Sequence, residues 1–344
     1  MTPLGRIIAR QIGARGPIGV ADYMALCLGH PAHGYYTTRD PLGAAGDFTT
    51  APEISQMFGE MVGLWLRAVW EAMGAPTLRL VELGPGRGTL MQDARRAMGR
   101  LAEAETWLVE TSPRLRAEQA RRLPAARWAE RLDQVPEGPA LIVANEFLDA
   151  LPVRQFLATP EGWRERQVGL AGGRLIWGLS GVLPGHEPAA PGAWREEAPA
   201  ARAVAGEIAR RIAAHGGAAL MIDYGYRAAE RPPGWTLQAL RRHAAADPLD
   251  APGEADLTWL VDFDALAADL APLGCRTTTQ GAFLGRMGIG QRAAALARAR
   301  PDRADTLADA LERLTGPEAM GTLFKVLAAL PVGAPTPPGF AEDA

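Results

Sequence analysis

Three glycines separate a run of apolar residues from a helical pattern in LRLVELGPGRGTLMQDARRA, residues 78–97. They are Gly84, Gly86 and Gly88, and the acid Glu82 precedes them. A glycine-rich turn between a strand and a helix presents backbone N–H groups, and the positive end of the helix, to a polar or anionic ligand. The segment therefore predicts a nucleotide-type pocket, but the glycines alone do not identify the ligand.

Three ligand classes compete for this loop. A P-loop requires GxxxxGK[ST], which the residues after Gly84 do not supply. A dinucleotide fingerprint requires glycine or alanine at its third position, where this chain has Thr89. The spacing acid-x-Gly-x-Gly-x-Gly from Glu82 to Gly88, with Pro85 inside it, matches the loop of class I proteins that bind S-adenosylmethionine. Glu82 can then meet the ammonium group of that ligand in a charge-assisted hydrogen bond.

A second acid follows the next predicted strand. The run TWLVE ends at Glu110, where a carboxylate can accept hydrogen bonds from both hydroxyls of a ribose. NAD-binding proteins share this acid, so it supports the fold more than it identifies the ligand. Together the loop and the two acids favour a methyl donor, with an NAD site and a purely structural turn as alternatives.

A third polar cluster lies in ALIVANEFLDALP, at the end of a buried strand and in the turn after it. In open parallel sheets ligands bind at this edge, so we expect Asn145 beside the donor. Glu146 and Asp149 could hold a guanidinium by bidentate hydrogen bonds and align one nitrogen with the methyl group. The alternative is that both acids cap a helix and pair with Arg154. Asp223, in IDYGY, either completes the acidic pocket or only ends the next strand.

The elements that must position these residues predict an α/β fold. Strand patterns alternate with helix patterns in LRLVEL, GTLMQDARRAMG, TWLVET, SPRLRAEQARRL and ALIVANEF. This alternation predicts a Rossmann-like parallel sheet with helices on both faces. Residues 153–183 predict inserted antiparallel ribbons, and residues 184–199 a surface loop. A long helix is expected over Ile54–Met73, with Thr50 as a plausible cap.

Composition narrows the function classes. The chain has 344 residues, 48% of them hydrophobic, which allows one large domain or two. A net charge of −3 gives no general attraction to nucleic acid. Two distant cysteines and five scattered histidines show no ligand spacing, so no metal site is expected. No window reads as a membrane span or a secretory signal, so we expect a cytoplasmic protein without membrane insertion.

Seven segments resemble, in order, the signature blocks of the MidA-like methyltransferases, and the match as a whole runs from about residue 17 to residue 330. These segments are GDFTTAPEISQMFGE, LVELGPGRGTL, VANEFLDALPV, IDYGY, APGEADLTWLVDF, FLGRMGIGQR and GPEAMGTLFKVL. Mitochondrial members of this family methylate an arginine on a peripheral-arm subunit of respiratory complex I and are needed for its assembly. The resemblance is more specific than the glycine loop alone.

The resemblance implies a class I methyltransferase core with an N-terminal helical section and an inserted substrate-binding lobe. We expect residues 1–77 to form the N-terminal section, 78–152 and 214–335 the core, and 153–213 the lobe. The resemblance also implies that the GDFTTAPE segment covers the donor, although it could instead be a simple helix-entry turn. The pocket candidates that it supplies are Asp47, Thr49, Thr50 and Glu53.

One block departs from the family pattern. The family commonly has a histidine just before the VDF of the GEADLT block, where this chain has Trp259 and Leu260. If that histidine handles a proton, this protein works without it; the other interpretation is that the position packs.

The expected function is protein arginine N-methylation with S-adenosylmethionine as donor. The resemblance implies a NuoD-type subunit of complex I as the protein substrate and a role in the assembly of that complex; a homodimer is left open. The alternatives are a silent assembly factor, a methyltransferase for another protein or a small molecule, and an NAD-dependent dehydrogenase. Intact Glu82, Gly86, Glu110 and Glu146 argue against a silent factor, since a degenerate site should have lost some of them.

Overall fold

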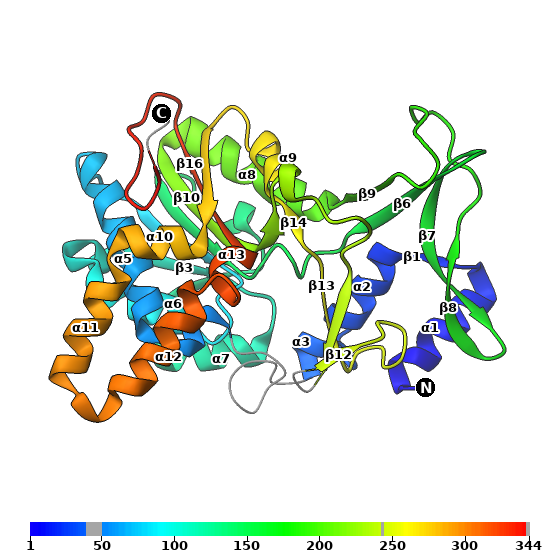
Figure 1. Ribbon diagram of the computed structural model, residues 1–344, viewed down its shortest axis with the longest axis horizontal. Coiled ribbons are helices and arrows are strands. Elements are labelled where there is room, and N and C mark those ends of the chain that lie inside the picture. Colours follow the sequence, from blue (N-terminus) through cyan, green and yellow to red (C-terminus); the bar gives the residue numbers. More distant parts are fainter. Residues whose placement is uncertain (39–49, 242–243, 342–344) are drawn as a thin grey trace. The chain divides into compact units, whose positions relative to one another are not determined.

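The computed structural model describes residues 1–38, 50–241 and 244–341 (Figure 1). Its contacts divide the chain into two compact units, each discontinuous in sequence. The smaller unit contains residues 1–48, 149–202 and 230–260, and the larger unit contains residues 49–148, 203–229 and 261–344.

A mixed β-sheet forms the centre of the larger unit, in the strand order β15-β16-β10-β5-β2-β3-β4. Five strands of this row are parallel, whereas β16 is antiparallel to both of its neighbours, β10 and β15. The parallel sheet expected from the sequence is therefore correct for five strands and wrong for this edge. The strand bounds are β2 Arg79–Leu83, β3 Glu105–Val109, β4 Arg127–Ala129, β5 Ala140–Asn145, β10 Gly217–Tyr226, β14 Val261–Asp262, which pairs with β10, β15 Gly274–Thr279 and β16 Phe324–Leu330.

The order of the strands reverses direction between β2 and β5. From β2 the chain proceeds outward to β3 and β4, returns to β5 beside β2, and then continues on the other side to β10. Ligands of open α/β sheets bind outside the carboxyl ends of the strands at such a reversal. The register pairs Leu83 with Ala144, so the glycine loop and the turn after β5 start from adjacent strand ends.

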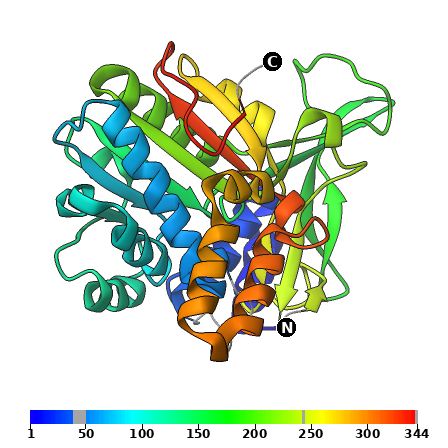
Figure 2. The same cartoon turned by 60° about the vertical axis from the view of Figure 1, so that its left-hand side comes forward.

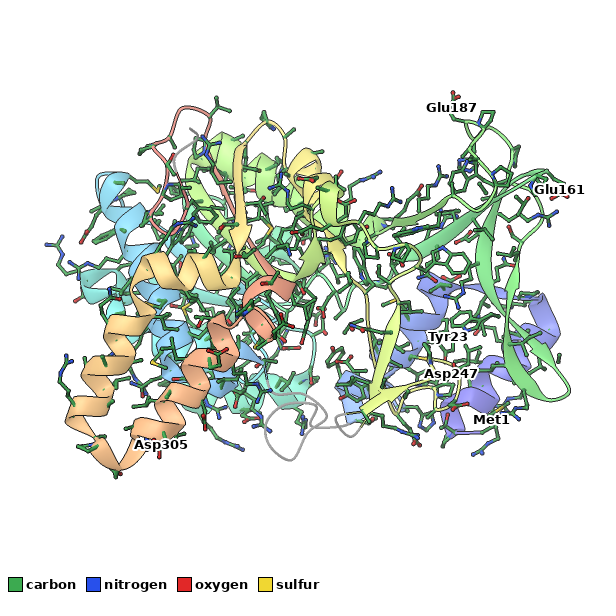
Figure 3. The ribbon with its side chains drawn as sticks, in the orientation of Figure 1. Met1, Tyr23, Glu161, Glu187, Asp247 and Asp305 are labelled. Atoms are coloured by element: carbon green, nitrogen blue, oxygen red, sulfur yellow. The ribbon has the colours of Figure 1, made fainter. Side chains whose placement is uncertain are left out.

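The helices of the larger unit cover its sheet, and α5 packs against α6 and α11 (Figure 2). Glu60 of α5 forms a bidentate ion pair with Arg292 of α11, with both N···O distances 2.7 Å. The helix bounds are α4 Ala51–Ile54, α5 Gln56–Ala72, α6 Thr89–Ala97, α7 Pro113–Arg122, α8 Pro199–His215, α9 Phe263–Asp269, α10 Gln280–Met287, α11 Ile289–Ala299, α12 Ala304–Thr315, which begins near Asp305 in Figure 3, and α13 Met320–Leu323.

The helix expected over Ile54–Met73 is divided at its start. Ser55 has an extended backbone and accepts a hydrogen bond from the Met57 N–H, so it caps α5, and the preceding residues form the separate short helix α4. Thr50 occupies the N-cap position of α4, but its side chain makes no capping hydrogen bond. The sequence thus located the helix and missed its break.

The smaller unit is built on antiparallel ribbons. Strands β6 Arg154–Thr159, β7 Gly162–Ala171 and β8 Arg174–Leu179 confirm the ribbons expected for residues 153–183, and Glu161 marks a turn tip in Figure 3. Strand β9, Trp194–Glu197, pairs with β6, so the loop expected over residues 184–199 is wrong at its end. The remaining elements are α1 Pro3–Arg15, β1 Ile18–Gly19, α2 Val20–Gly29, α3 Tyr35–Thr38, β11 Gln238–Arg241, β12 Ala244–Ala246 and β13 Asp256–Thr258.

The two units group the sequence differently from the expected domains. Helix α5 and residues 203–213 belong to the larger unit, whereas residues 230–260 belong to the smaller unit. The reason for α5 is its apolar face, since Trp65 and Leu66 are buried in one hydrophobic core with Leu80 of β2 and Leu141 of β5. Among the described residues, no helix has the length and hydrophobicity needed to span a membrane.

Candidate active site

The glycine loop joins β2 to α6 in the larger unit. The φ angles of Gly84, Gly86 and Gly88 are 60°, 52° and 80°, in the left-handed region that disfavours residues with a Cβ. A Cβ on Gly84 would lie 2.7 Å from Cδ2 of Phe147, so the loop approaches the turn after β5 closely. Gly88 occupies the N-cap position of α6 and supplies no side chain there. The loop geometry therefore depends on glycine.

Glu82 lies in β2 and is only 3% exposed. The backbone N–H of Met91 hydrogen-bonds to its carboxylate, but Oε2 has no hydrogen-bond partner among the described residues. Burial raises the pKa of Glu82 to about 8, and the hydrogen bond from Met91 offsets only part of this effect. A buried carboxylate oxygen without a partner is costly unless a cation or donor meets it. Glu82 therefore fits a ligand that brings an ammonium group.

Glu110 directly follows β3 and is 9% exposed. Its Oε1 accepts a hydrogen bond from the Ser112 N–H at 2.7 Å, and its Oε2 accepts one from Gln119 Nε2 at 3.3 Å. Burial raises the pKa of Glu110, while these two hydrogen bonds and the nearby Arg116 guanidinium oppose the rise. The orientation of this carboxylate is thus fixed by the protein itself.

Gln119, on α7, is a residue that the sequence analysis did not single out. Its Nε2 also donates to the Gly86 carbonyl at 2.7 Å, and its Oε1 accepts from Trp128 Nε1 at 2.8 Å. It therefore connects the glycine loop to Glu110. No motif could have revealed it, because a single glutamine inside a helix has no distinctive spacing.

The turn after β5 begins at Glu146, whose φ of 49° is unusual for a residue with a side chain. Its N–H donates to the Ile222 carbonyl at 2.9 Å, and its Oε1 accepts from the Ala51 N–H at 3.0 Å and from Asn145 Nδ2 at 3.2 Å. Oδ1 of Asn145 is buried and without a hydrogen-bond partner in the described part of the chain. Strained backbone of this kind is common at functional sites.

Asp223, in β10, supports that turn. Its Oδ2 accepts hydrogen bonds from the N–H groups of Phe147 and Leu148 at 3.2 and 2.8 Å, and its Oδ1 accepts one from the Tyr224 N–H at 2.9 Å. These contacts favour a positioning role over the catalytic role that the sequence also allowed. Asp223 thus acts on the turn that carries Glu146.

Asp149 belongs to the smaller unit and is buried there. Its carbonyl accepts a hydrogen bond from the Trp259 N–H at 3.3 Å. Burial and the nearby Asp256 and Asp149 carboxylates raise the pKa of Tyr36, in the same unit. The assignment of Asp149 as a guanidinium ligand stays a prediction.

Two residues that bear on open alternatives are engaged elsewhere in the smaller unit. Arg154 forms a bidentate pair with Glu165, with N···O distances of 2.9 and 2.8 Å. Trp259, which replaces the family histidine, is buried and donates from Nε1 to the Leu151 carbonyl at 2.9 Å. At Trp259, therefore, the side chain packs.

Only part of the GDFTTAPE segment, which is expected to cover the methyl donor, lies in the described residues. Asp47 and Thr49 lie outside the described residues. Glu53 of α4 accepts a hydrogen bond from Thr89 Oγ1 at 2.5 Å, and its Oε2 lies 3.9 Å from Nη1 of Arg87. Glu53 therefore contacts the glycine loop and the first residue of α6.

The chemistry available in the described residues is that of carboxylates and amides. No group of three or more histidine, cysteine, aspartate or glutamate side chains in this part of the chain could hold a metal ion. Burial raises the pKa of the Cys27 thiol to about 12, so little reactive thiolate forms there. The arrangement is suited to binding and orienting a cationic, hydroxyl-bearing ligand.

The comparisons with known proteins agree with this site. Residues 61–280 match a family described as S-adenosyl-L-methionine-dependent methyltransferase. Protein arginine methyltransferase NDUFAF7 from Mus musculus mitochondria is 38% identical over 96% of this chain and 85% of its own length. Its Drosophila melanogaster homolog is 37% identical over 94% of this chain and 85% of its own length.

A solved structure gives the same result. A COG1565 superfamily protein from Burkholderia thailandensis, crystallised with bound S-adenosyl-homocysteine, is 29% identical with a TM-score of 0.86, covering 98% of this chain and 93% of that chain. The expected fold and methyl donor are therefore confirmed. The glycine loop, the two buried acids and these matches lead to one conclusion: the chain belongs to the family of S-adenosyl-L-methionine-dependent methyltransferases.

Proposed function

We propose that this methyltransferase acts on arginine side chains of a protein. The observation that supports S-adenosylmethionine as the methyl donor is the buried Glu82. Its Oε2 has no hydrogen-bond partner among the described residues, and three left-handed glycines follow it in the chain. The proposal that a protein arginine accepts the methyl group is supported by the relatives, which are named protein arginine methyltransferases.

The residues of the larger unit divide the binding of the donor among them. Glu82 would meet its ammonium group, residues 84–88 would let the backbone approach it, and Glu110 would accept hydrogen bonds from its ribose hydroxyls. The sulfonium of the donor supplies a methyl group that is already activated, so the protein must mainly orient the acceptor and receive a proton.

Glu146 is the carboxylate that we propose for the acceptor. It lies at the sheet edge where ligands of this fold bind, and hydrogen bonds from Ala51 and Asn145 fix its Oε1. A carboxylate matches the planar donor fork of a guanidinium, and it can hold one nitrogen in line with the methyl group. Asp223 would position this turn.

The client protein is inferred from the family resemblance. On the resemblance to the MidA-like family, we propose a NuoD-type subunit of respiratory complex I, methylated in the cytoplasm during assembly of that complex. A lysine-bearing protein or a small molecule is the competing substrate class, since carboxylates also bind ammonium groups.

Two experiments test the proposal one after the other: ligand binding to the protein, and then isotopic labelling of its substrates. Thermal denaturation should show stabilisation by S-adenosylmethionine and S-adenosyl-homocysteine and none by NAD. Extract from a strain lacking the gene is then incubated with the enzyme and deuterated-methyl donor, and peptides are sequenced by mass spectrometry. Label on arginine of a complex I subunit is expected. Label on lysine or small molecules would overturn the arginine assignment, and binding without any transfer would indicate a silent assembly factor.

A further inference from the structure

Gln119 makes contacts that no donor-binding motif contains. The side chain is fully buried, at 0% exposure, in the middle of α7. Its amide group touches three separate elements: the glycine loop at Gly86, the end of β3 at Glu110, and β4 at Trp128. A fully buried amide would be costly without such partners.

The orientation of this amide is determined by its partners. An indole N–H can only donate, so Trp128 Nε1 requires the oxygen of Gln119, at 2.8 Å. The NH₂ group must then face the Gly86 carbonyl and the Glu110 carboxylate, both of which accept, at 2.7 and 3.3 Å. Each polar atom of the amide has one role, and a rotation of the group would break all three contacts.

We propose that Gln119 is a positioning residue for the methyl donor, which fixes the glycine loop and the ribose carboxylate relative to one another. The inference rests on the proposed role of Glu110 at the ribose. The Ser112 N–H fixes Oε1 of Glu110, and Gln119 fixes Oε2, so the carboxylate is oriented from both ends. The same amide holds the carbonyl of the left-handed Gly86. Both donor contacts thus depend on one side chain.

The charge of Glu110 gives the proposal a measurable signature. Burial raises the pKa of Glu110, and the groups that oppose the rise are the N–H groups of Ser112 and Thr111, the Gln119 amide and the Arg116 guanidinium. Replacing Gln119 removes the amide N–H that donates to Glu110, and the pKa of Glu110 should then rise further. Since ribose binding needs the ionised carboxylate, the acidic limit of donor binding should move to higher pH.

The test compares three variants of the full chain by calorimetric titration with S-adenosyl-homocysteine, and with 5′-methylthioadenosine for the pH dependence, between about pH 5.5 and 8. Gln119→Met removes the hydrogen bonds at similar size, and we expect about tenfold weaker binding. Gln119→Glu keeps the bond to Trp128 but places a carboxylate oxygen against Gly86 and Glu110, so about 100-fold weaker binding is expected. Trp128→Phe frees the amide to rotate and should have the smallest effect.

A packing variant on the same helix is the matched control. Leu115→Ala removes a buried side chain of α7 that is not part of this hydrogen-bond network, so it should lower the melting temperature and leave the affinity unchanged. 5′-Methylthioadenosine, which lacks the amino-acid part of the donor, should lose the same fold of affinity as S-adenosyl-homocysteine in the Gln119 variants. Glu82→Gln should weaken only S-adenosyl-homocysteine.

Two results would overturn the inference. The first is a Gln119→Met protein that behaves like Leu115→Ala, with reduced stability and wild-type affinity at all pH values. The second is weaker binding of 5′-methylthioadenosine, which has no ammonium group for Glu82, with an unmoved acidic limit, because then Gln119 does not act through Glu110. Wild-type protein that fails to bind S-adenosyl-homocysteine would instead contradict the donor assignment, so the two failures can be distinguished.

Discussion

Glu82 and Glu110 are two buried acids at the ends of neighbouring parallel strands, and they differ in how the protein satisfies them. Both oxygens of Glu110 accept hydrogen bonds, from Ser112 and Gln119. The carboxylate of Glu82 accepts a hydrogen bond from the Met91 N–H, and its Oε2 has no hydrogen-bond partner among the described residues. Burial raises the pKa of both acids, and for Glu82 the value reaches about 8.

Under the roles that we propose for the two acids, the carboxylate assigned to the ribose is oriented before the donor binds, whereas the one assigned to the ammonium group still has an oxygen without a partner among the described residues. A carboxylate that accepts hydroxyl hydrogens needs a fixed direction, which Ser112 and Gln119 provide. A carboxylate that binds a cation instead needs few competing hydrogen-bond donors. Oε2 of Glu82 is buried and has no partner among the described residues, so the proposed ammonium group would displace none of them. On this proposal, the burial of Glu82 lowers the stability of the unliganded protein and donor binding would offset that loss, whereas the hydrogen bonds of Glu110 already offset part of its burial.

The largest effect is expected from Gly86→Val, which changes the loop between the two acids. A β-branched residue at a φ of 52° is strained, and its side chain would enter the space that the donor needs, so binding should weaken more than ~100-fold. Calorimetry with S-adenosyl-homocysteine measures the loss. Gly172→Val is the control, because Gly172 has a φ of 55° in the smaller unit and no atom of the described residues lies within 4 Å of its Cβ position. Equal loss of binding in both proteins would mean that strain alone explains the effect.

Glu146→Gln should separate chemistry from donor binding. The amide is isosteric and can still accept the Ala51 N–H, but it has no charge to hold a guanidinium or receive its proton. We expect methyl transfer to slow by about 10²–10³-fold, within the usual range for a lost acid–base group. Affinity for S-adenosyl-homocysteine should change little. Unchanged transfer would remove Glu146 from the mechanism.

Replacing each of the two acids by glutamine sharpens their comparison. Glu82→Gln should weaken S-adenosyl-homocysteine binding by about 10- to 100-fold, the value of a hydrogen bond to a charged group. The raised pKa of Glu82 means that its contribution to stability is present below pH ~4.5 and is lost as the pH rises through about 8. The unliganded variant should therefore lose less stability than wild type over that range, as chemical denaturation can measure.

Glu110→Gln should behave differently, since it breaks a satisfied network. Its amide cannot offer two acceptor oxygens to Ser112 and Gln119, so both stability and affinity should fall. Identical effects of the two glutamine variants on stability would contradict the distinction between the acids.

The local parts of the fold and site could be predicted from the sequence. The turn of the glycine loop and the placement of Glu82 and Glu110 at neighbouring strand ends could be predicted because motif spacing and strand ends are properties of a short segment; the contacts of these residues with the donor stay a prediction. The parallel strands could be read for the same reason. The direction of β16 could not, because several helices separate it from β15 and its seven buried residues show no alternation that would reveal its neighbours.

The missed features depend on contacts between distant segments. Gln119 forms hydrogen bonds with Trp128 and with the glycine loop. Asp223 accepts hydrogen bonds from the N–H groups of the turn after β5. The left-handed backbone of Glu146 is also invisible in the sequence, because nothing in NEF specifies a positive φ. The domain boundaries differed because α5 is amphipathic and its apolar face is buried in the core of the larger unit.

The most direct test of the account is the proton balance of donor binding. Because the pKa of unliganded Glu82 is about 8, much of this carboxyl group is protonated at pH 7, and the arrival of an ammonium group should expel that proton. Calorimetric titration with S-adenosyl-homocysteine at pH 7, in buffers of different ionisation enthalpy, counts the protons released. We predict release approaching one proton per site in the wild type and its loss in Glu82→Gln. Binding with no proton release, or release that Glu82→Gln leaves unchanged, would contradict the account.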